Sequence, residues 1–214
     1  MTNLLVVTVV AAERDAICDR IPSGAATVLV GGIGPAACAA ATSAALAAAS
    51  YDAASYDVVL SAGIAGGFCA PVGAVAIASS VVFADLGAET ADGFIPLPNA
   101  VNRLDVAPWL SAELARRTGA ITGTVVTVAT VTGTAATADA LRARHPDVVA
   151  EAMEGFGVAT AAVVHGAAFG EVRAISNAVG PRDRASWRVP EALDALGEAF
   201  ATLTAQPLAG KVEP

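Results

Sequence analysis

The sequence is poor in the residues that build metal sites, disulfide frameworks and membrane spans. Its 214 residues include three cysteines and only two histidines, His145 and His165. An odd number of cysteines without paired spacing argues against a disulfide framework or a zinc ribbon, and two histidines argue against a multi-histidine metal site. No run approaches the roughly 20 apolar residues that a membrane-spanning helix needs. We therefore predict no metal site and no membrane partner.

Positive charge is also scarce. Twelve lysines and arginines face 20 acids, which gives a net charge of −8, and no lysine or arginine occurs between Ile21 and Asn102. A nucleic-acid-binding protein would act against its own negative field, so nucleic acid is not an expected partner. The N-terminus lacks a basic region and a cleavage site, which favours a first strand over a signal peptide. The expected compartment is the cytoplasm.

Hydrophobic residues make up 55% of the chain and charged residues 15%, a composition typical of a folded domain. Continuous apolar, β-branched runs predict strands that are covered on both faces. The predicted strands are 4–10, 26–30, 57–62, 72–83 (with a bulge), 121–132, 148–152 and 171–179. The predicted helices are 35–50, 107–118, 135–144, 154–165 and 190–204. This alternation predicts one α/β domain, residues 1–204, with a central mixed, largely parallel twisted sheet flanked by helices. Residues 205–214 are expected to form a loose tail.

Ligands of such a sheet bind beyond the carboxyl ends of its strands, so the strand-to-loop junctions are where chemistry is expected. Glu13 follows the first strand and is either a general base or an acid in the first turn of a helix. Two junctions are rich in glycine, 31–35 and 61–67. They are either ligand-binding loops or tight turns that need positive φ. The first lacks the spacing of a dinucleotide fingerprint and the Lys-Ser/Thr pair of a phosphate loop.

Two further junctions carry polar side chains. The first holds Glu151, Met153 and Glu154 between a strand and a helix. A glutamate there is able to accept both hydroxyl protons of a vicinal diol, and a methionine packs softly against a sugar; the alternative is a helix N-terminal acid beside a core methionine. The second ends a strand at Asn177, whose amide donates and accepts at once. The alternative for Asn177 is an ordinary turn asparagine.

Together these junctions resemble those of the nucleoside phosphorylase and nucleosidase superfamily, over about residues 4–204. The segments that carry the resemblance are Ala11-Ala12-Glu13, Gly32-Ile33-Gly34, 62–67, Met153-Glu154-Gly155 and Ile175-Ser176-Asn177. Within the superfamily the chain is most similar to the nucleosidases that cleave methylthioadenosine. The runs 130–134 and 176–183, with Trp187, are similar to futalosine hydrolases, which release hypoxanthine from futalosine in the alternative menaquinone pathway.

The resemblance implies a role for each matching residue. Glu13 would orient and deprotonate the attacking water, Glu154 would bind the ribose hydroxyls, and Met153 would lie under the ribose. Asn177 stands where the adenine-specific enzymes carry an aspartate. The other substrate-binding positions that we predict are Gly34, Ala65, Gly66, Val131, Thr132, Arg182 and Trp187.

The loop 180–188 is expected to act as a lid over the 5′ substituent of the substrate. Trp187 would stack on an aromatic ring there, and Arg182 or Arg184 would pair with a carboxylate. The alternative is that Arg182, Asp183 and Arg184 form a surface charge cluster and that Trp187 belongs to the core.

Asparagine at position 177 suits a 6-oxopurine, because its NH2 donates to O6 and its oxygen accepts a proton from N7. Both glycine-rich junctions lie in the stretch without lysine or arginine, which favours water over phosphate as the nucleophile, unless a neighbouring subunit supplies an arginine. We therefore expect hydrolysis of the N-glycosidic bond of futalosine, without a cofactor, in a homo-oligomer. The alternatives are another purine nucleosidase of the methylthioadenosine type, a purine nucleoside phosphorylase, or a non-catalytic purine-binding protein.

Overall fold

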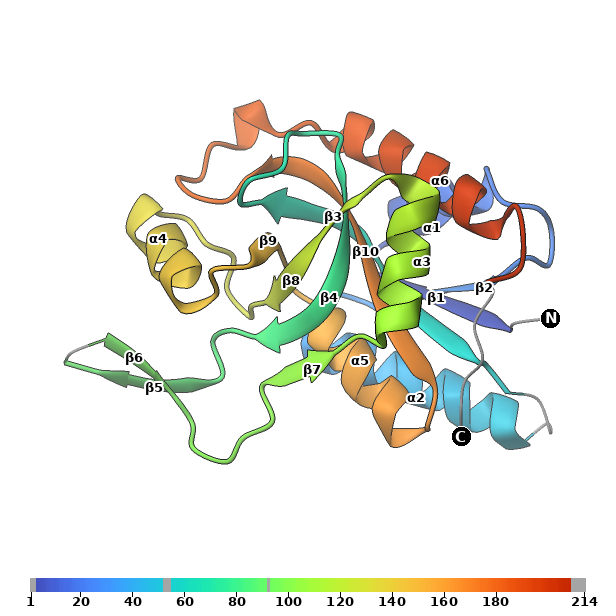
Figure 1. Cartoon of the computed structure of the whole chain (residues 1–214), viewed down its shortest axis with the longest axis horizontal. Helices are drawn as coiled ribbons and strands as arrows, with labels where there is room; N and C mark the ends of the chain where they lie inside the picture. The colour runs from blue at the N-terminus through green and yellow to red at the C-terminus, as the bar shows by residue number, and fades with distance from the viewer. Residues whose placement is uncertain (1–2, 52–54, 92, 209–214) are drawn as a thin grey trace.

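A mixed β-sheet runs through the centre of the chain, and helices pack on both of its sides (Figure 1). The computed structural model describes residues 3–51, 55–91 and 93–208. The strands of the main sheet are β1 (Leu4–Thr8), β2 (Thr27–Val30), β3 (Val58–Gly67), β4 (Val75–Phe83), β7 (Arg103–Asp105), β8 (Ile121–Thr127), β9 (Val148–Ala152) and β10 (Ala168–Ala178). A separate hairpin projects from the body and consists of β5 (Gly87–Thr90) and β6 (Gly93–Pro96).

The main sheet closes on itself. Its strand order is β10-β4-β8-β9-β3-β1-β2, and β3 also pairs with β10, so β3, β10, β4, β8 and β9 form a ring. Five strand pairs are parallel, namely β1–β2, β1–β3, β3–β10, β4–β8 and β8–β9. The pairs β10–β4, β3–β9 and β4–β7 are antiparallel. The predicted α/β domain with a mixed, largely parallel sheet is confirmed, while the closure of the sheet is new information from the structure.

The helices are α1 (Ala11–Cys18), α2 (Pro35–Tyr51), α3 (Pro108–Thr118), α4 (Ala135–Arg144), α5 (Gly155–Val164), α6 (Val189–Thr204) and the short 3-10 helix η1 (Arg184–Ser186). Helices α2 and α5 pack together on one side of the sheet, and α1, α3 and α6 pack on the other (Figure 1). A proline opens the first turn of α3, where its missing N–H costs nothing, and Gly119 ends this helix in the left-handed conformation. None of the helices in the described ranges is long and apolar enough to cross a membrane.

Most predicted elements are present within a few residues of the expected bounds. The helix 135–144 and the strand 148–152 are confirmed at their bounds, and the predicted bulge of β4 lies between Ala78 and Ser80. The prediction of a turn at 61–67 is wrong, because β3 continues to Gly67 and pairs there with both β10 and β9. The predicted strand 121–132 ends at Thr127, so positions 131 and 132 lie in a loop. Strand β7, the hairpin β5–β6 and the 3-10 helix η1 were not predicted, and α1 was anticipated only by the alternative interpretation of Glu13 as a helix N-terminal acid.

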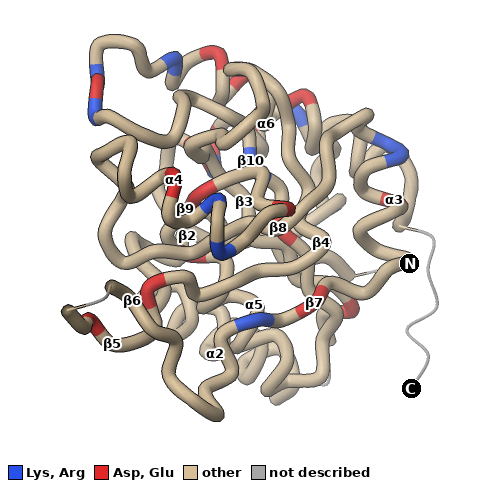
Figure 2. Tube along the Cα trace, turned by 60° about the vertical axis from the view of Figure 1, so that its left-hand side comes forward, with Lys and Arg blue, Asp and Glu red and all other residues tan. Residues whose placement is uncertain are grey.

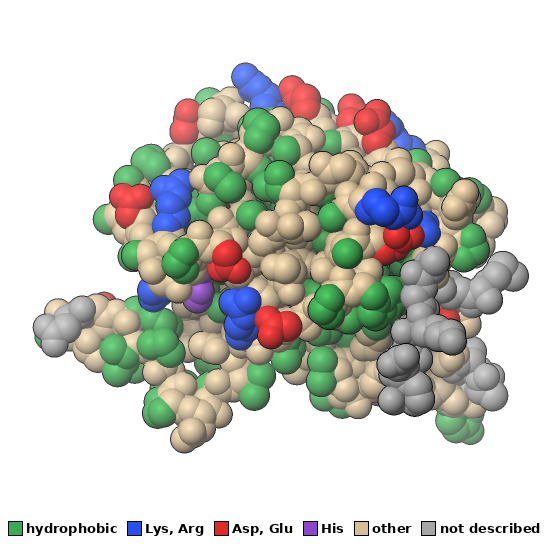
Figure 3. All heavy atoms as spheres, in the orientation of Figure 1, with side chains coloured by type: hydrophobic (Ala, Val, Ile, Leu, Met, Phe, Trp, Pro, Cys, Tyr) green, Lys and Arg blue, Asp and Glu red, His purple; other side chains and the backbone are tan. Residues whose placement is uncertain are grey.

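The chain beyond α6 is held by Arg117 from α3. Its guanidinium donates to the carbonyl oxygens of Leu203, Gln206 and Pro207, at 2.6 to 2.8 Å. Leu208 is buried in the core. Of the expected loose tail, residues 209–214 lie outside the described residues. On the molecular face seen in Figure 3, basic and acidic side chains are interspersed rather than gathered by sign.

Candidate active site

A buried arginine, Arg173 on β10, forms the centre of a cluster of charged side chains. Charged residues are sparse along the strands (Figure 2), and Arg173 is fully buried. Its Nε donates to Oε1 of Glu171 at 2.7 Å, and its Nη2 donates to the Ser61 hydroxyl at 2.9 Å and lies 3.6 Å from Oε2 of Glu154. Burial lowers the pKa of Arg173, but Glu171, Glu154 and Glu13 together raise it above its usual value. The guanidinium therefore stays charged and holds the acids around it.

Glu13 is buried at the start of α1 and is fixed by three backbone N–H groups. Its Oε2 accepts from Val9 at 2.9 Å and from Val10 at 3.3 Å, as in a helix cap. Its Oε1 accepts from Ile64 on β3 at 2.9 Å. A Cβ at Gly63 would lie 2.6 Å from this Oε1 and 2.7 Å from Nη1 of Arg173, so only glycine fits between them. Glu13 is thus an acid in the first turn of a helix, as one of the two interpretations predicted. Its carboxylate is also hydrogen-bonded to β3, beside Arg173.

Glu154 enters the same cluster from the junction of β9 and α5. It occupies the N-cap position of α5, yet its side chain makes no capping bond. Instead its Oε1 accepts from the backbone N–H of Gly34 at 3.1 Å. Gly34 has a φ of 90°, a left-handed conformation that glycine adopts without strain. The neighbouring Met153 is half-buried, so the structure places Gly34, Glu154 and Met153 together.

A gap in the pairing of β3 lies next to this cluster. One edge of β3 pairs with β1 up to Ser61 and with β9 from Gly66 onward. Between them, the N–H of Ile64 donates to Glu13 rather than to a strand. The gap gives access to the backbone of β3 at the carboxyl ends of the strands, where ligands of α/β sheets bind.

Asn177 lies at the far end of β10, opposite Gly66. The register of β10 against β3 shifts between Ile175 and Asn177, and a bulge of this kind redirects side chains. Asn177 is half-buried; its Nδ2 donates to the Ala178 carbonyl at 2.9 Å and its Oδ1 accepts from the Ser176 hydroxyl at 2.8 Å. Ala65 contributes its backbone, because its carbonyl also accepts from Ser176, at 3.2 Å.

The loop after β8 is attached to β9 through Thr132. The backbone N–H of Thr132 donates to Oε1 of Glu151 at 2.9 Å, and its hydroxyl donates to Oε2. Burial raises the pKa of the Glu151 carboxyl, the two hydrogen bonds from Thr132 oppose this rise, and the nearby Asp85 adds to it. Val131 lies beside Thr132 in this loop and is half-buried.

The predicted lid lies against the same loop. The N–H of Arg182 donates to the carbonyl of Gly133 at 3.2 Å. The Cζ atoms of Arg182 and Arg184 lie 5.5 and 5.7 Å from the ring centre of Trp187. Trp187 is half-buried, while both arginines are exposed, so the ring is neither a core residue nor free in solvent. The side chain of Arg182 stacks on this ring and is separate from the buried carboxylates.

The structure thus brings Glu13, Gly34 and Glu154 to one centre, and it brings Ala65, Gly66 and Asn177 to the next residues along β3. Sequence reasoning missed Arg173 and Glu171, and it named Glu151 without giving it a role. A signal for the first two was present, because a Glu and an Arg two residues apart within an apolar strand share one face and pair there. Within the described residues no group of three or more His, Cys, Asp or Glu side chains is placed to hold a metal ion.

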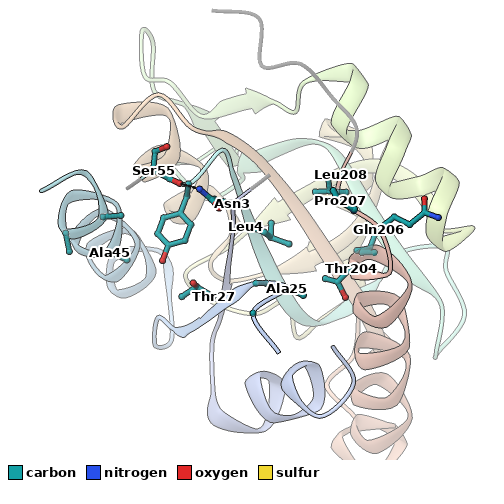
Figure 4. Close-up of a pocket in the computed structure, with 16 residues that line it drawn as sticks. Asn3, Leu4, Ala25, Thr27, Ala45, Ser55, Thr204, Gln206, Pro207 and Leu208 are labelled. Carbon is teal, nitrogen blue, oxygen red and sulfur yellow. Dashed lines mark hydrogen bonds between the residues drawn. The ribbon is translucent and has the colours of Figure 1, made fainter. Parts of the chain in front are cut away.

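A separate cavity of about 830 Å³ opens at the other end of the strands (Figure 4). Its lining includes Asn3, Thr27, Ala45, Tyr56 and Thr204, and it contains none of the predicted site residues. It is therefore distinct from the charged cluster.

Known proteins that are similar in sequence or in structure share this architecture. The sequence model of the phosphorylase superfamily matches residues 7–208. A futalosine hydrolase of Streptomyces coelicolor is 51% identical over 223 aligned residues, which cover 94% of each chain. A solved structure of futalosine hydrolase from Helicobacter pylori superposes with a TM-score of 0.79 at 16% identity, over 94% of this chain and 97% of that one. The 5′-methylthioadenosine/S-adenosylhomocysteine nucleosidase of Neisseria meningitidis superposes with a TM-score of 0.76 at 21% identity, over 96% and 97% of the two chains.

Proposed function

The chain belongs to the phosphorylase superfamily, and we propose that it is a futalosine hydrolase, an enzyme that splits the N-glycosidic bond of futalosine. The products are hypoxanthine and dehypoxanthine futalosine, within menaquinone biosynthesis. The observation that carries this proposal is the buried cluster in which Glu13 accepts from Ile64 of β3 and Glu154 faces Arg173, with Asn177 paired to Gly66 further along β3, in a chain half identical to the Streptomyces coelicolor enzyme. A 6-oxopurine nucleoside meets an acceptor for a water proton, an acceptor for ribose hydroxyls and an amide for its base.

Glu13 acts on water in this proposal. The bond between the anomeric carbon and the purine nitrogen breaks, the sugar gains oxocarbenium character, and water adds to the anomeric carbon while losing a proton to Glu13. The three N–H donors fix the carboxylate, so little reorganisation is needed. Nη1 of Arg173 is buried without a hydrogen-bond partner within the described part of the chain and lies beside Glu13, so it adds positive charge next to this carboxylate.

Glu154 holds the sugar. Its Oε2 accepts from the Met153 N–H at 3.3 Å and lies 3.6 Å from Nη2 of Arg173. Its Oε1 accepts from the Gly34 N–H and keeps a lone pair for a ribose hydroxyl. Met153, half-buried beside it, supplies the apolar contact under the sugar ring. Holding the ribose in one orientation converts the attack of water into an effectively unimolecular step.

Asn177 binds the leaving base. Its NH2 donates to O6, and its oxygen accepts the proton that N7 carries once the base leaves. These contacts replace the present bonds to Ala178 and Ser176. An amide is not a strong acid, so the proton itself reaches N7 from water. A mismatched base would leave a buried polar group unpaired, which costs about 1–3 kcal/mol.

Water rather than phosphate is the nucleophile. A phosphate dianion needs cationic partners, and Arg173, the cation of this cluster, already faces Glu171 and Glu154. No lysine or arginine occurs in the sequence that forms the turn at Gly34 or the end of β3.

The loop 180–188 covers the 5′ substituent. Trp187 offers a ring face for the aromatic group of futalosine, and Arg182 and Arg184, now stacked on that ring, offer two charges for its carboxylate. We further propose that the enzyme acts in the cytoplasm as a homo-oligomer, whose state sedimentation measures directly.

Incubation with futalosine, inosine and methylthioadenosine, with and without phosphate, tests the proposal. We expect hypoxanthine from futalosine at a rate that phosphate does not change. Glu13→Gln should lower turnover by about 100-fold or more while inhibitor binding persists, as for a lost general base. Phosphate-dependent release would identify a phosphorylase, and wild-type turnover in Glu13→Gln would exclude the role of Glu13.

A further inference from the structure

Glu171 is a fully buried acid that the proposed mechanism leaves without a task. It lies on β10, and its Oε1 accepts from Nε of Arg173 at 2.7 Å. Its Oε2 has no hydrogen-bond partner within the described part of the chain. Burying a carboxylate is costly unless its surroundings compensate the charge. An acid in this apolar strand is therefore expected to do more than fill the core.

The register of β10 against β3 sets Glu171 and Arg173 opposite two small residues. Glu171 pairs with Ser61, and Arg173 pairs with Gly63. Directly paired residues project to the same face of a sheet, as do residues two apart on one strand. The guanidinium of Arg173 therefore occupies the space that Gly63 leaves open, and its Nη2 reaches the Ser61 hydroxyl at 2.9 Å.

The N-terminus of α5 leaves room for Glu171. Gly155 is the first residue of this helix, and a Cβ there would collide with both carboxylate oxygens of Glu171. The helix dipole places partial positive charge at this end, which favours an acid. The carboxylate is thus confined between the helix and Arg173, so it has little freedom to turn away from Nε.

The nitrogens of a guanidinium form one rigid plane, so fixing two of them determines where the third points. Glu171 holds Nε of Arg173, and Ser61 holds Nη2. The remaining Nη1 is buried beside Glu13, without a hydrogen-bond partner among the described residues. Without these two contacts the guanidinium would be free to turn toward Glu154, whose Oε2 already lies 3.6 Å from Nη2.

On the premise of the proposed function, we infer that Glu171, together with Ser61, is a positioning residue that orients the guanidinium of Arg173 so that Nη1 stays beside the Glu13 carboxylate. Glu171 and Ser61 are both buried, so they act through Arg173 and not by contact with a substrate. A misplacement of about 1 Å in such a site costs up to about 100-fold in rate.

A purely structural role makes different predictions. If Glu171 only balances the charge of Arg173, its removal lowers stability and leaves kcat of the folded enzyme unchanged. Glu171→Met removes the acceptor and keeps the length of the side chain. Glu171→Gln removes the charge but keeps an oxygen that accepts from Nε, so it preserves positioning and abolishes charge balance. Ser61→Ala removes the second contact without changing any charge.

Steady-state hydrolysis of futalosine separates the two roles. In Glu171→Met we expect kcat per folded enzyme to fall by about 10- to 100-fold. KM should change by less than about threefold, because Glu154 keeps its bonds from the N–H groups of Gly34 and Met153. Glu171→Gln should retain kcat within about fivefold of wild type, and Ser61→Ala should lower kcat by about three- to tenfold.

Glu113→Ala is the matched control for lost stability. The Glu113 carboxylate pairs with Arg117 at 2.7 Å on α3, and the two side chains are 14% and 9% exposed. Its loss should lower the free energy of unfolding without changing kcat, because neither residue belongs to the charged cluster. A fall in kcat that appears in Glu171→Met but not in this control is therefore not a consequence of lower stability.

NMR signals of the Arg173 guanidinium report its orientation without any substrate. A guanidinium held at two nitrogens rotates slowly and gives separate Nη signals, whereas an unrestrained one gives averaged signals. We expect separate signals in the wild type and in Glu171→Gln, and averaged signals in Glu171→Met. Arg173→Lys assigns the signals by their absence. If Glu171→Met does not fold, Ser61→Ala decides by the same two measurements.

Several outcomes overturn the inference. They are a kcat within about twofold of wild type in Glu171→Met or, where that variant does not fold, in Ser61→Ala; an equal loss of kcat in Glu171→Met and Glu171→Gln; and Nη signals that stay separate in Glu171→Met. A wild type that leaves futalosine intact but shows the expected change of the Arg173 signals refutes the hydrolase and keeps the orienting role of Glu171. Turnover of futalosine with unchanged signals does the reverse.

Discussion

Replacing Arg173 with methionine should destabilise the protein more than the replacement of any surface arginine. Arg173 and Glu171 are both fully buried, and their side chains meet at 2.7 Å. Methionine has a similar length but no charge, so Glu171, Glu154 and Glu13 lose the cation that they share. Removing one partner of a buried ion pair costs about 3–5 kcal/mol, because a buried charge is left uncompensated.

The size of this effect is a large share of the total stability, which is about 5–15 kcal/mol for a domain. Arg20 is the matched control. It forms exposed ion pairs with Asp194 and Glu198, and 35% of its side-chain surface is accessible to solvent. Arg20→Met should cost at most about 1 kcal/mol. Adding Glu171→Gln to Arg173→Met should recover about 1 kcal/mol or more, because the uncompensated charge is gone.

Urea unfolding followed by circular dichroism measures the free energy of unfolding of these variants. A loss of stability in Arg173→Met that equals the loss in Arg20→Met would show that the buried cluster is held by packing alone. A double variant as unstable as the sum of its single changes would show that Glu171 does not depend on Arg173. Either result would refute the reasoning about the shared cation.

Two further predictions concern the base and a buried thiol. Asn177→Asp should shift the preference of base release toward 6-aminopurines, because the carboxylate no longer donates to O6; an unchanged ratio of kcat/KM values for the 6-oxo and 6-amino substrates would contradict this. Burial, with Glu154 and Glu13 adding to it against Arg173, raises the pKa of Cys38 to about 12. At pH 8 its reactive thiolate is therefore only about 10⁻⁴ of the total. A thiol reagent at that pH should label the exposed Cys18 and Cys69 quickly and Cys38 only after unfolding. Rapid labelling of three thiols in the folded protein would contradict the burial of Cys38.

The local elements were predictable because their sequence patterns are continuous. All five residues of β1 are buried, and the run of apolar residues there has no polar alternation. Such a strand is covered on both faces, whatever the rest of the chain does. Its end was less predictable, since Val10 is as apolar as its neighbours and yet occupies the N-cap position of α1, without a capping bond from its side chain.

The continuation of β3 through its glycines was not predictable from local preference. Glycine weakens strands, so 61–67 has the composition of a turn. Two features of the tertiary structure decide otherwise: β10 and β9 supply hydrogen bonds along this segment, and the carboxylate of Glu13 occupies the place of a side chain at Gly63. Both partners are distant in sequence.

The candidate site was predictable where a junction carries its own polar residue, as at Glu13, Glu154 and Asn177, whose roles stay predictions. It was not predictable where an arrangement depends on two strands meeting. Glu151 lies opposite Gly66 only because the sheet closes and sets β9 against the end of β3. A single sequence contains no signal for that closure.

The order of groups along β3 limits where a substrate is able to bind. Gly63 lies against Glu13 and Arg173, and Gly66 lies against Val179 and Asn177. Because successive residues of a strand project to opposite faces, these two glycines, three positions apart, face opposite sides of β3. The edge of β3 that is left unpaired between Ser61 and Gly66 lies between the two groups. A substrate that uses both Glu13 and Asn177 must therefore bind along this edge and not across one face of the strand.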